Sequence, residues 1–189
     1  MRVHFVCTGN ICRSPMAELL LRSALDERGC SDIEVSSSGT WATDGLAATR
    51  SAAETMAALG LDLTSHRARA LEPAFVDEAD LVVVMTSVHE REVLEVAPEA
   101  ASRLVLLKEL VPMRAAAGDV DGSAEARFSR LMASPRPERR RALDVDDPMG
   151  LPITAYERCA KELQAGVRAL ADVLCSGSGD LRMGPEGRH

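Results

Sequence analysis

Aromatic side chains are scarce in this sequence. Three Phe, one Tyr and one Trp make up 3% of the 189 residues, whereas apolar residues in total reach 46%. We therefore expect a hydrophobic core built from aliphatic side chains and alanine. A chain of this length suits one domain with a sizeable core.

Excess positive charge and long apolar runs are also missing. The formal net charge is −7, whereas a nucleic-acid-binding protein needs a basic face, so we expect no nucleic-acid partner. No apolar stretch approaches the roughly 20 residues that cross a bilayer, so we expect no membrane association. Met1 and Arg2 lead directly into a short apolar run, and no signal-peptide pattern is visible.

The cysteines form no recognisable framework. There are five of them, an odd number scattered along the chain, and no pair has zinc-finger spacing. We therefore expect no disulfide framework and a reducing cytoplasm as the location. The five are Cys7, Cys12, Cys30, Cys159 and Cys175.

Apolar periodicity predicts the fold class. Short apolar runs predict strands at 3–6, 33–35, 81–85 and 104–107. Helical spacing predicts one helix after the N-cap Ser14, with Pro15 as its first residue, and a second at 49–59. Capping boxes at 87–90 and 154–157 predict the starts of two more helices. This alternation predicts an α/β fold, with helices on both faces of a three-layer, doubly wound, four-stranded parallel sheet. Ligands of such sheets bind beyond the carboxyl ends of the strands.

A single domain is expected over residues 1–175. Residues 112–143 fall outside the strand–helix pattern, apart from one short helix predicted at 124–132. This insertion leads into an Asp-Pro segment, so it is either a flap near the pocket mouth or a loose surface excursion. Residues 176–189 are rich in Gly and Ser and predict a disordered tail.

The segment from Cys7 to Pro15 carries the chemistry. It reads Cys-Thr-Gly-Asn-Ile-Cys-Arg-Ser-Pro between a predicted strand and a predicted helix. Such a turn directs backbone amides into one concavity that binds anions, and Gly9 and Asn10 tolerate the positive φ that it needs. Arg13 and the helix dipole favour a thiolate at Cys7, and Arg13 offers a planar fork for phosphate. The alternative reading of Cys7 is a buried strand-end thiol.

The nucleotide-binding pattern Gly-x4-Gly-Lys-Ser/Thr is absent, so this is not a nucleotide P-loop. Instead, the segment resembles the signature of the low-molecular-weight protein tyrosine phosphatases. Further resemblances follow in the same order along the chain. They are Ser38-Gly39-Thr40-Trp41, His66-Arg67-Ala68-Arg69, Ala79-Asp80-Leu81-Val82 and Asp147-Pro148.

The resemblance implies roles for individual residues. Cys7 is the implied nucleophile, Arg13 stabilises the phosphoryl oxygens and Asp147 is the general acid, with Asp144 and Asp146 as the alternative, solvated carboxylates. The phosphate-binding loop consists of Thr8, Gly9, Asn10, Ile11, Cys12 and Ser14. The substrate pocket is implied at Ile11, Trp41 and Met149, and a supporting hydrogen-bond network at Ser38 and His66. No metal or other cofactor is expected, because Arg13 and the loop amides do the work of a divalent ion.

Cys12 has two readings. The resemblance suggests that a Cys7–Cys12 disulfide protects the nucleophile from over-oxidation. The alternative is a small residue that fills space within the loop. The sequence does not choose between them.

The substrate class depends on Ile11. The related arginine phosphatases carry threonine there, and a bulky apolar residue favours a flat aromatic ring, so we expect phosphotyrosine, with phosphoarginine as the alternative. Met149 departs from the aromatic residue usual in tyrosine phosphatases. A thiol-dependent arsenate reductase needs further cysteines near the middle of the chain, and residues 31–158 contain none. We expect a phosphorylated protein as partner and a monomer or weak dimer.

Overall fold

The computed structural model describes residues 1–118, 122–138 and 141–175 of the chain. Four parallel strands form a sheet in the order β2-β1-β3-β4. Their bounds are Arg2–Cys7 (β1), Glu34–Gly39 (β2), Leu81–Val84 (β3) and Leu104–Leu106 (β4). All four predicted strands and their parallel arrangement are confirmed. The tail predicted at 176–189 lies outside the described residues.

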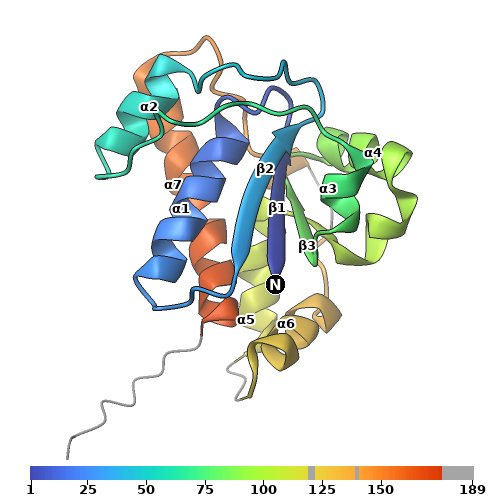
Figure 1. Cartoon of the computed structure of the whole chain (residues 1–189). Coiled ribbons are helices and arrows are strands. Elements are labelled where there is room, and N and C mark those ends of the chain that lie inside the picture. The colour runs from blue at the N-terminus through green and yellow to red at the C-terminus, as the bar shows by residue number, and fades with distance from the viewer. Residues whose placement is uncertain (119–121, 139–140, 176–189) are drawn as a thin grey trace, which may run out of the picture.

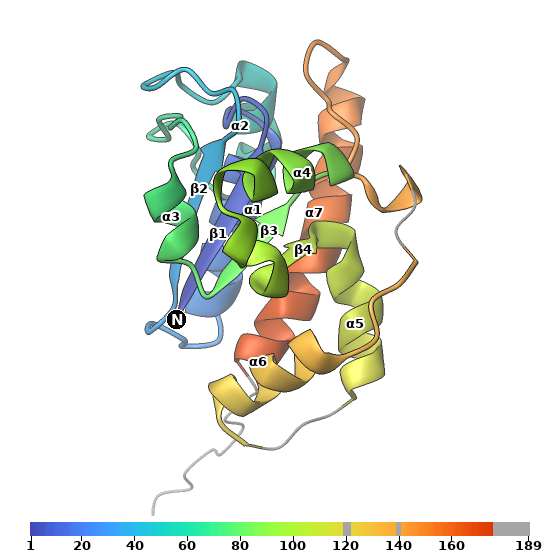
Figure 2. The same ribbon diagram turned by 90° about the vertical axis from the view of Figure 1, so that its right-hand side faces the viewer.

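Helices cover both faces of this sheet (Figure 1, and Figure 2 after a quarter turn). One face carries α1 (Arg13–Asp26), α2 (Arg50–Ala57), α5 (Leu110–Ala117) and α7 (Ile153–Leu174), and the other carries α3 (Pro73–Asp77) and α4 (Ser87–Val96). Short 3-10 helices lie at Pro98–Arg103, Leu107–Glu109 and Arg141–Leu143. The three-layer α/β fold is therefore confirmed. Within the described ranges, no helix is long and apolar enough to cross a bilayer.

Strand β3 shows how the layers are held together. Leu81 and Val83 pack into the core beneath α1 and α7, whereas Val82 and Val84 pack into the core beneath α4. Successive side chains of a strand point to opposite faces, so an unbroken apolar run serves both cores. Each fully buried aliphatic side chain contributes about 1.5–3 kcal/mol.

The predicted helix caps are wrong in their positions. Helix α1 starts at Arg13, so Ser14 lies inside its first turn and is free to contact the loop. Helix α4 is capped by Thr86, whose Oγ1 accepts a hydrogen bond from the backbone N–H of His89. Thr86 and the adjacent Ser87 can both cap a helix, and the sequence pattern predicts Ser87 as the cap. Helix α7 follows Pro152 with no side-chain cap.

The insertion at 112–143 is neither a flap nor a loose excursion in its described part. Helix α5 and helix α6 (Ala124–Ala133) pack against α7, with Met113 and Leu131 fully buried. Arg127 of α6 donates hydrogen bonds to the carbonyls of Val173 and Leu174, at the last turn of α7. The 22 residues of α7 span about 33 Å. Helix α6 therefore lies at the end of the molecule remote from the start of α7 (Figure 2).

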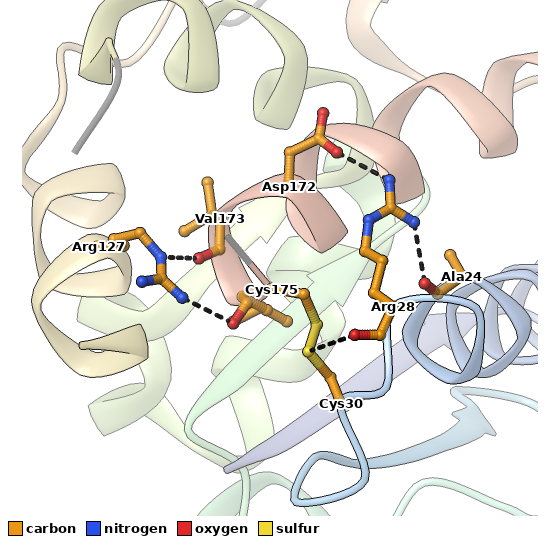
Figure 3. Close-up of a disulfide and its surroundings, with 8 residues drawn as sticks. Ala24, Arg28, Cys30, Arg127, Asp172, Val173 and Cys175 are labelled. Carbon is orange, nitrogen blue, oxygen red and sulfur yellow. Dashed lines mark hydrogen bonds and ion pairs between the residues drawn. A yellow bond between two sulfur atoms is a disulfide. The ribbon is translucent and has the colours of Figure 1, made fainter. Parts of the chain in front are cut away.

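A disulfide joins Cys30 to Cys175, a pairing that the expectation of no disulfide framework did not include. Figure 3 shows it between the segment after α1 and the end of α7. The two helices run side by side in the same direction, so their last turns meet although 145 residues separate the cysteines. Arg28 strengthens this junction by pairing with Asp172 at 2.8 Å. Disulfides are typical of oxidising compartments, so the cysteines no longer argue for a reducing one.

Removing this disulfide should destabilise the fold. A cross-link across 145 residues restricts the unfolded chain, and such bonds typically contribute about 2–4 kcal/mol. We expect Cys30→Ser to lower the free energy of unfolding in urea by this amount under oxidising conditions. Reductant should lower the wild type to the same level and leave the variant unchanged. A wild-type midpoint that is insensitive to reductant would contradict the prediction.

His4 is a buried polar residue that joins β1 to β2. Its Nδ1 and Nε2 each lie 2.7 Å from a serine hydroxyl, of Ser36 and Ser38 respectively. Its ring stacks on Phe75 of α3. Burial, followed by the positive charge of Arg69, lowers the pKa of His4 from 6.5 to about 3. The folded protein therefore holds His4 neutral at every pH near neutrality.

This lowered pKa predicts a loss of stability in acid. In the unfolded chain His4 takes up a proton near pH 6.5, but in the folded protein only near pH 3. The stabilisation is therefore complete above pH 6.5 and declines by about 1.4 kcal/mol per pH unit as the pH falls towards 3. Between pH 5.5 and 4, we expect the urea-unfolding free energy of His4→Gln to fall less steeply by that amount per unit. Parallel slopes for the two proteins would show that His4 is not responsible.

Candidate active site

The loop from Cys7 to Arg13 lies at the carboxyl end of β1. Cys7 ends the strand, Arg13 starts α1, and the turn between them forms part of the upper edge of the sheet in Figure 1. The Cys7 thiol is buried, and its Sγ lies 3.0 Å from the hydroxyl of Ser14. Helix α1 begins two residues earlier than the sequence suggests, so Ser14 is its second residue and not its cap.

Asn10 shapes this loop. It alone among the described non-glycine residues has a positive φ, at 51°, whereas Gly9 has none. Its fully buried side chain donates to Ser14 Oγ at 2.9 Å and to Ser37 Oγ at 2.8 Å, and accepts from the backbone N–H of Arg69 at 2.9 Å. Two amide hydrogens and the amide oxygen are all used, so the loop conformation is fixed by a satisfied buried group.

Gly39 at the end of β2 allows the strand to press against the loop. A Cβ atom there would lie 2.4 Å from the carbonyl oxygen of Thr8 and 2.8 Å from the amide nitrogen of Asn10. Any side chain would therefore push β2 away from the loop. The backbone N–H of Thr40 and of Trp41 donate to the carbonyls of Cys7 and Thr8, each at 2.9 Å.

The supporting network differs from the expected one at a single residue. The hydroxyl of Ser38 faces His4, and only its backbone carbonyl meets Ser14, at 3.3 Å. Ser37 instead supplies the hydroxyl that Asn10 binds, and it donates in turn to Glu18 of α1 at 2.6 Å. Alternation along β2 from buried Val35 would have placed Ser37 on the α1 face. His66 lies beside this network, with its Nε2 donating to the carbonyl of Asn10 at 2.7 Å.

Arg13 extends from α1 across the loop, and its side chain is 5% exposed. One Nη donates to the carbonyl of Val145 at 3.2 Å, and the other contacts Asp147 at 2.5 Å and Thr8 Oγ1 at 3.4 Å. Its buried Nε meets no acceptor among the described residues. A buried guanidinium N–H is costly to leave unpaired, so it is available to an incoming anion.

Asp147 is the carboxylate that the fold brings to the loop. Its Oδ2 pairs with Arg13, and its Oδ1 accepts from the backbone N–H of Met149 at 3.1 Å. The alternatives lie elsewhere. Asp144 accepts from the backbone N–H of Ser87 at the start of α4, so it supports the fold rather than being a solvated charge. Asp146 is exposed to solvent.

Side chains of mixed character surround the loop. Ile11 is half-buried, whereas Trp41 is 75% and Met149 54% exposed, so neither of the latter is a core residue. The indole N–H of Trp41 donates to Glu92 of α4 at 2.8 Å. A tryptophan held at the surface beside the loop can stack on a planar ligand group.

No sequence pattern indicates a role for His89 at this loop. This residue is buried at the start of α4, with its Nε2 2.9 Å from Thr8 Oγ1 and its Nδ1 2.9 Å from Thr86 Oγ1. Burial, and then the charge of Arg13, lower its pKa from 6.5 to about 4. The contact joins residues 81 positions apart, which no local pattern indicates.

Cys12 and Cys159 are buried free thiols, as is Cys7. Cys12 lies 3.3 Å from Thr49 Oγ1 and donates a long hydrogen bond of 3.9 Å to the hydroxyl oxygen of Tyr156. Burial raises the pKa of Cys12, and raises that of Cys159 to about 12. Both therefore remain protonated at neutral pH. No group of His, Cys, Asp or Glu within residues 1–118, 122–138 and 141–175 is arranged to hold a metal ion.

Chemically, the site offers a sulfur nucleophile, a buried guanidinium and a carboxylate around one anion-binding turn. Comparison with known proteins agrees with this arrangement. The family model for low molecular weight phosphotyrosine protein phosphatase matches residues 2–126. The probable low molecular weight protein-tyrosine-phosphatase EpsP of Ralstonia solanacearum is 33% identical over 164 residues, covering 87% of this chain and 89% of that protein.

Two further relatives extend the comparison. The protein-arginine-phosphatase of Geobacillus stearothermophilus is 32% identical over 173 residues, covering 92% of this chain and 95% of that protein. The crystal structure of the low molecular weight protein tyrosine phosphatase from T. tengcongensis superposes with a TM-score of 0.70 and 33% identity, covering 90% of this chain and 97% of that one. The chain therefore belongs to the low molecular weight phosphotyrosine protein phosphatase family, and it is a phosphatase.

Proposed function

We propose that the protein hydrolyses phosphotyrosine in protein substrates through a phosphocysteine intermediate. The observation that carries this proposal is the meeting of the Cys7 thiol, the unpaired Nε of Arg13 and the Asp147 carboxylate at one loop. The three groups correspond to the nucleophile, the electrostatic stabiliser and the proton donor that phosphoryl transfer requires.

The reaction takes two steps. The Cys7 thiolate attacks phosphorus, so an S–P bond forms as the bond from phosphorus to the tyrosyl oxygen breaks, and Asp147 protonates the departing oxygen. The Asp147 carboxylate then takes a proton from water, whose oxygen attacks phosphorus and releases inorganic phosphate with the Cys7 thiolate. Ser14 stabilises that thiolate. Its Oγ accepts from Asn10, and its single hydrogen lies within reach of both the carbonyl of Ser38, at 3.3 Å, and the sulfur, at 3.0 Å, so it can turn to the sulfur when the thiolate forms.

The ion pair between Arg13 and Asp147 describes the enzyme before substrate binds. Asp147 occupies one Nη of Arg13 at 2.5 Å, while Nε stays unpaired. A phosphate dianion competes for the same guanidinium, because it offers several anionic oxygens to a planar fork. Binding therefore frees the Asp147 carboxylate, which takes up a proton as the Cys7 thiol gives one up and then turns towards the leaving group as the acid.

Ile11 favours a tyrosyl substrate. The side chain of Ile11 is aliphatic and half-buried, and it lies close enough to Gly9 to touch a Cβ atom built there. Trp41 is exposed beside the same loop. Flat apolar surfaces suit a phenyl ring better than a phosphoguanidinium. Phosphoarginine is the second candidate. The relative from Geobacillus stearothermophilus is named a protein-arginine-phosphatase, and Met149 leaves the pocket without an aromatic wall at that position.

Substrate choice can be tested by replacing Ile11. We expect the wild type to hydrolyse phosphotyrosine peptides with a higher kcat/KM than phosphoarginine peptides of matched sequence. Ile11→Thr removes apolar surface and adds a hydroxyl, so the ratio of the two values should shift towards phosphoarginine by about 10-fold or more, the discrimination that one or two methylene groups supply. Ile11→Val is the matched control and should keep the preference. A wild type that prefers phosphoarginine would overturn the assignment.

The roles of Cys7 and Asp147 are tested together. Cys7→Ser should abolish turnover. Asp147→Asn should lower kcat for phosphotyrosine about 10²–10⁴-fold, the contribution of a general acid. The loss should be smaller for p-nitrophenyl phosphate, because its leaving group hardly needs a proton. Asp146→Asn removes an exposed carboxylate from the neighbouring position and should leave kcat within twofold. Equal losses in Asp146→Asn and Asp147→Asn would refute the assignment of the acid.

The wider proposal covers organisation and setting. We infer one catalytic domain over residues 1–175, acting as a monomer or weak dimer on a phosphorylated protein in the cytoplasm. A reducing cytoplasm keeps the buried thiols of Cys7 and Cys12 unpaired, as they are found here. The Cys30–Cys175 disulfide instead favours an oxidising compartment. If this disulfide persists in cell extracts prepared with a thiol-blocking reagent, the proposed cytoplasmic location is wrong.

A further inference from the structure

We propose that His89, acting through the hydroxyl of Thr8, is a positioning residue for Arg13. This inference rests on the proposed function, because Arg13 matters only if the loop binds phosphate. His89 itself does not contact the reacting atoms. It holds the acceptor that orients the guanidinium.

The imidazole of His89 is held at both of its nitrogens. Nε2 lies 2.9 Å from Thr8 Oγ1, in the loop, and Nδ1 lies 2.9 Å from Thr86 Oγ1, at the cap of α4. The side chain is only 3% exposed, and the backbone N–H of the same residue donates to Thr86 Oγ1 at 3.3 Å. A ring fixed in this way cannot turn without breaking two hydrogen bonds. It therefore transmits the rigidity of α4 to the loop.

The hydroxyl of Thr8 links His89 to Arg13. Its Oγ1 also accepts from an Nη of Arg13, at 3.4 Å. If Nε2 of His89 carries the ring proton, Thr8 accepts from both neighbours. If Nδ1 carries it, Thr8 donates to His89 and accepts from Arg13. In either tautomer a lone pair of Thr8 faces the guanidinium.

The imidazole has to be neutral for this arrangement. A doubly protonated ring would place a second cation near Arg13, and burial together with that charge lowers the pKa of His89 to about 4. The ring is therefore uncharged throughout the neutral pH range. Asp144, Asp147 and Glu92 also lie near enough to act on it, but their attraction for a charged ring is smaller than the cost of its burial.

The contact becomes important when Asp147 leaves Arg13. In the free enzyme the guanidinium is held by Val145, Asp147 and Thr8. Once Asp147 turns to protonate the leaving group, the carbonyl of Val145 holds one Nη and the hydroxyl of Thr8 is the acceptor that remains for the other. Thr8 is half-buried in a loop, so its side chain is fixed by the bond to His89 rather than by packing.

Two amide substitutions separate this role from a purely structural one. A Gln amide nitrogen reaches the place of Nε2 and keeps the bond to Thr8, whereas an Asn amide nitrogen takes the place of Nδ1 and keeps only the bond to Thr86. We expect His89→Gln to stay within threefold of the wild type. His89→Asn and Thr8→Val should each weaken inorganic phosphate binding and lower kcat/KM by about 10-fold, the lower end of the effect for a bond to a charged group.

The measurements are the dissociation constant of inorganic phosphate, by ³¹P NMR titration without turnover, and kcat and KM for a phosphotyrosine peptide. The double variant with His89→Asn and Thr8→Val should be no worse than either single one, because both break the same chain. Neither change should have a further effect once Arg13 is replaced by Lys. Thr55→Val removes another buried threonine hydroxyl, in α2, and should leave phosphate binding unchanged.

Two results would overturn the inference. One is equal phosphate affinity in His89→Gln and His89→Asn. The other is an undiminished loss in the Arg13→Lys background, which would make His89 a residue of the fold only. Failure of the proposed function has a different signature, because a wild type that binds phosphate with these sensitivities but does not hydrolyse the peptide would refute the reaction and not the positioning.

Discussion

The side chain of Asn10 is the interaction on which the site depends. One buried amide joins the loop to α1 through Ser14, to β2 through Ser37 and to the segment before α3 through the backbone of Arg69. Both amide hydrogens and the amide oxygen are hydrogen-bonded in a fully buried place, so a displacement of one element leaves a buried polar group unpaired. The left-handed backbone at Asn10 persists for the same reason, since the surrounding contacts stabilise a conformation that is otherwise sparsely populated.

Charge is arranged around this rigid turn so that each group has a temporary or permanent partner. The carbonyl of Val145 and the hydroxyl of Thr8 hold Arg13 permanently in the proposed cycle, whereas Asp147 holds it only until phosphate arrives. His89 and His4 are both buried and both kept neutral, and each one links a strand or loop to its neighbour through serine or threonine hydroxyls. Neutral imidazoles serve this purpose because they can be buried without the cost of a charge.

The fold was predictable because its determinants are local. The apolar run of β3 is buried on both faces, and alternating strands and helices lead to a parallel sheet with few other solutions. The loop was predictable because its function needs particular residues in succession. The prediction was wrong where two adjacent residues both carry a hydroxyl group and only one of them makes the hydrogen bond. Ser37 and Thr86 act where Ser38 and Ser87 were expected, and a shift of one residue reverses the direction in which a side chain points.

The sequence by itself determined the sheet, the family and the position of the turn between β1 and α1, because periodicity and contiguous motifs are local properties of a chain. Only the tertiary structure decided the long-range pairings. It placed α5 and α6 against α7 rather than over the site, joined Cys30 to Cys175, and brought His89 to Thr8. These contacts join segments that are far apart in the sequence but adjacent in the folded protein. No local sequence pattern indicates which segments will be adjacent. In the same loop that the sequence identified, the fold added the partner that orients its arginine.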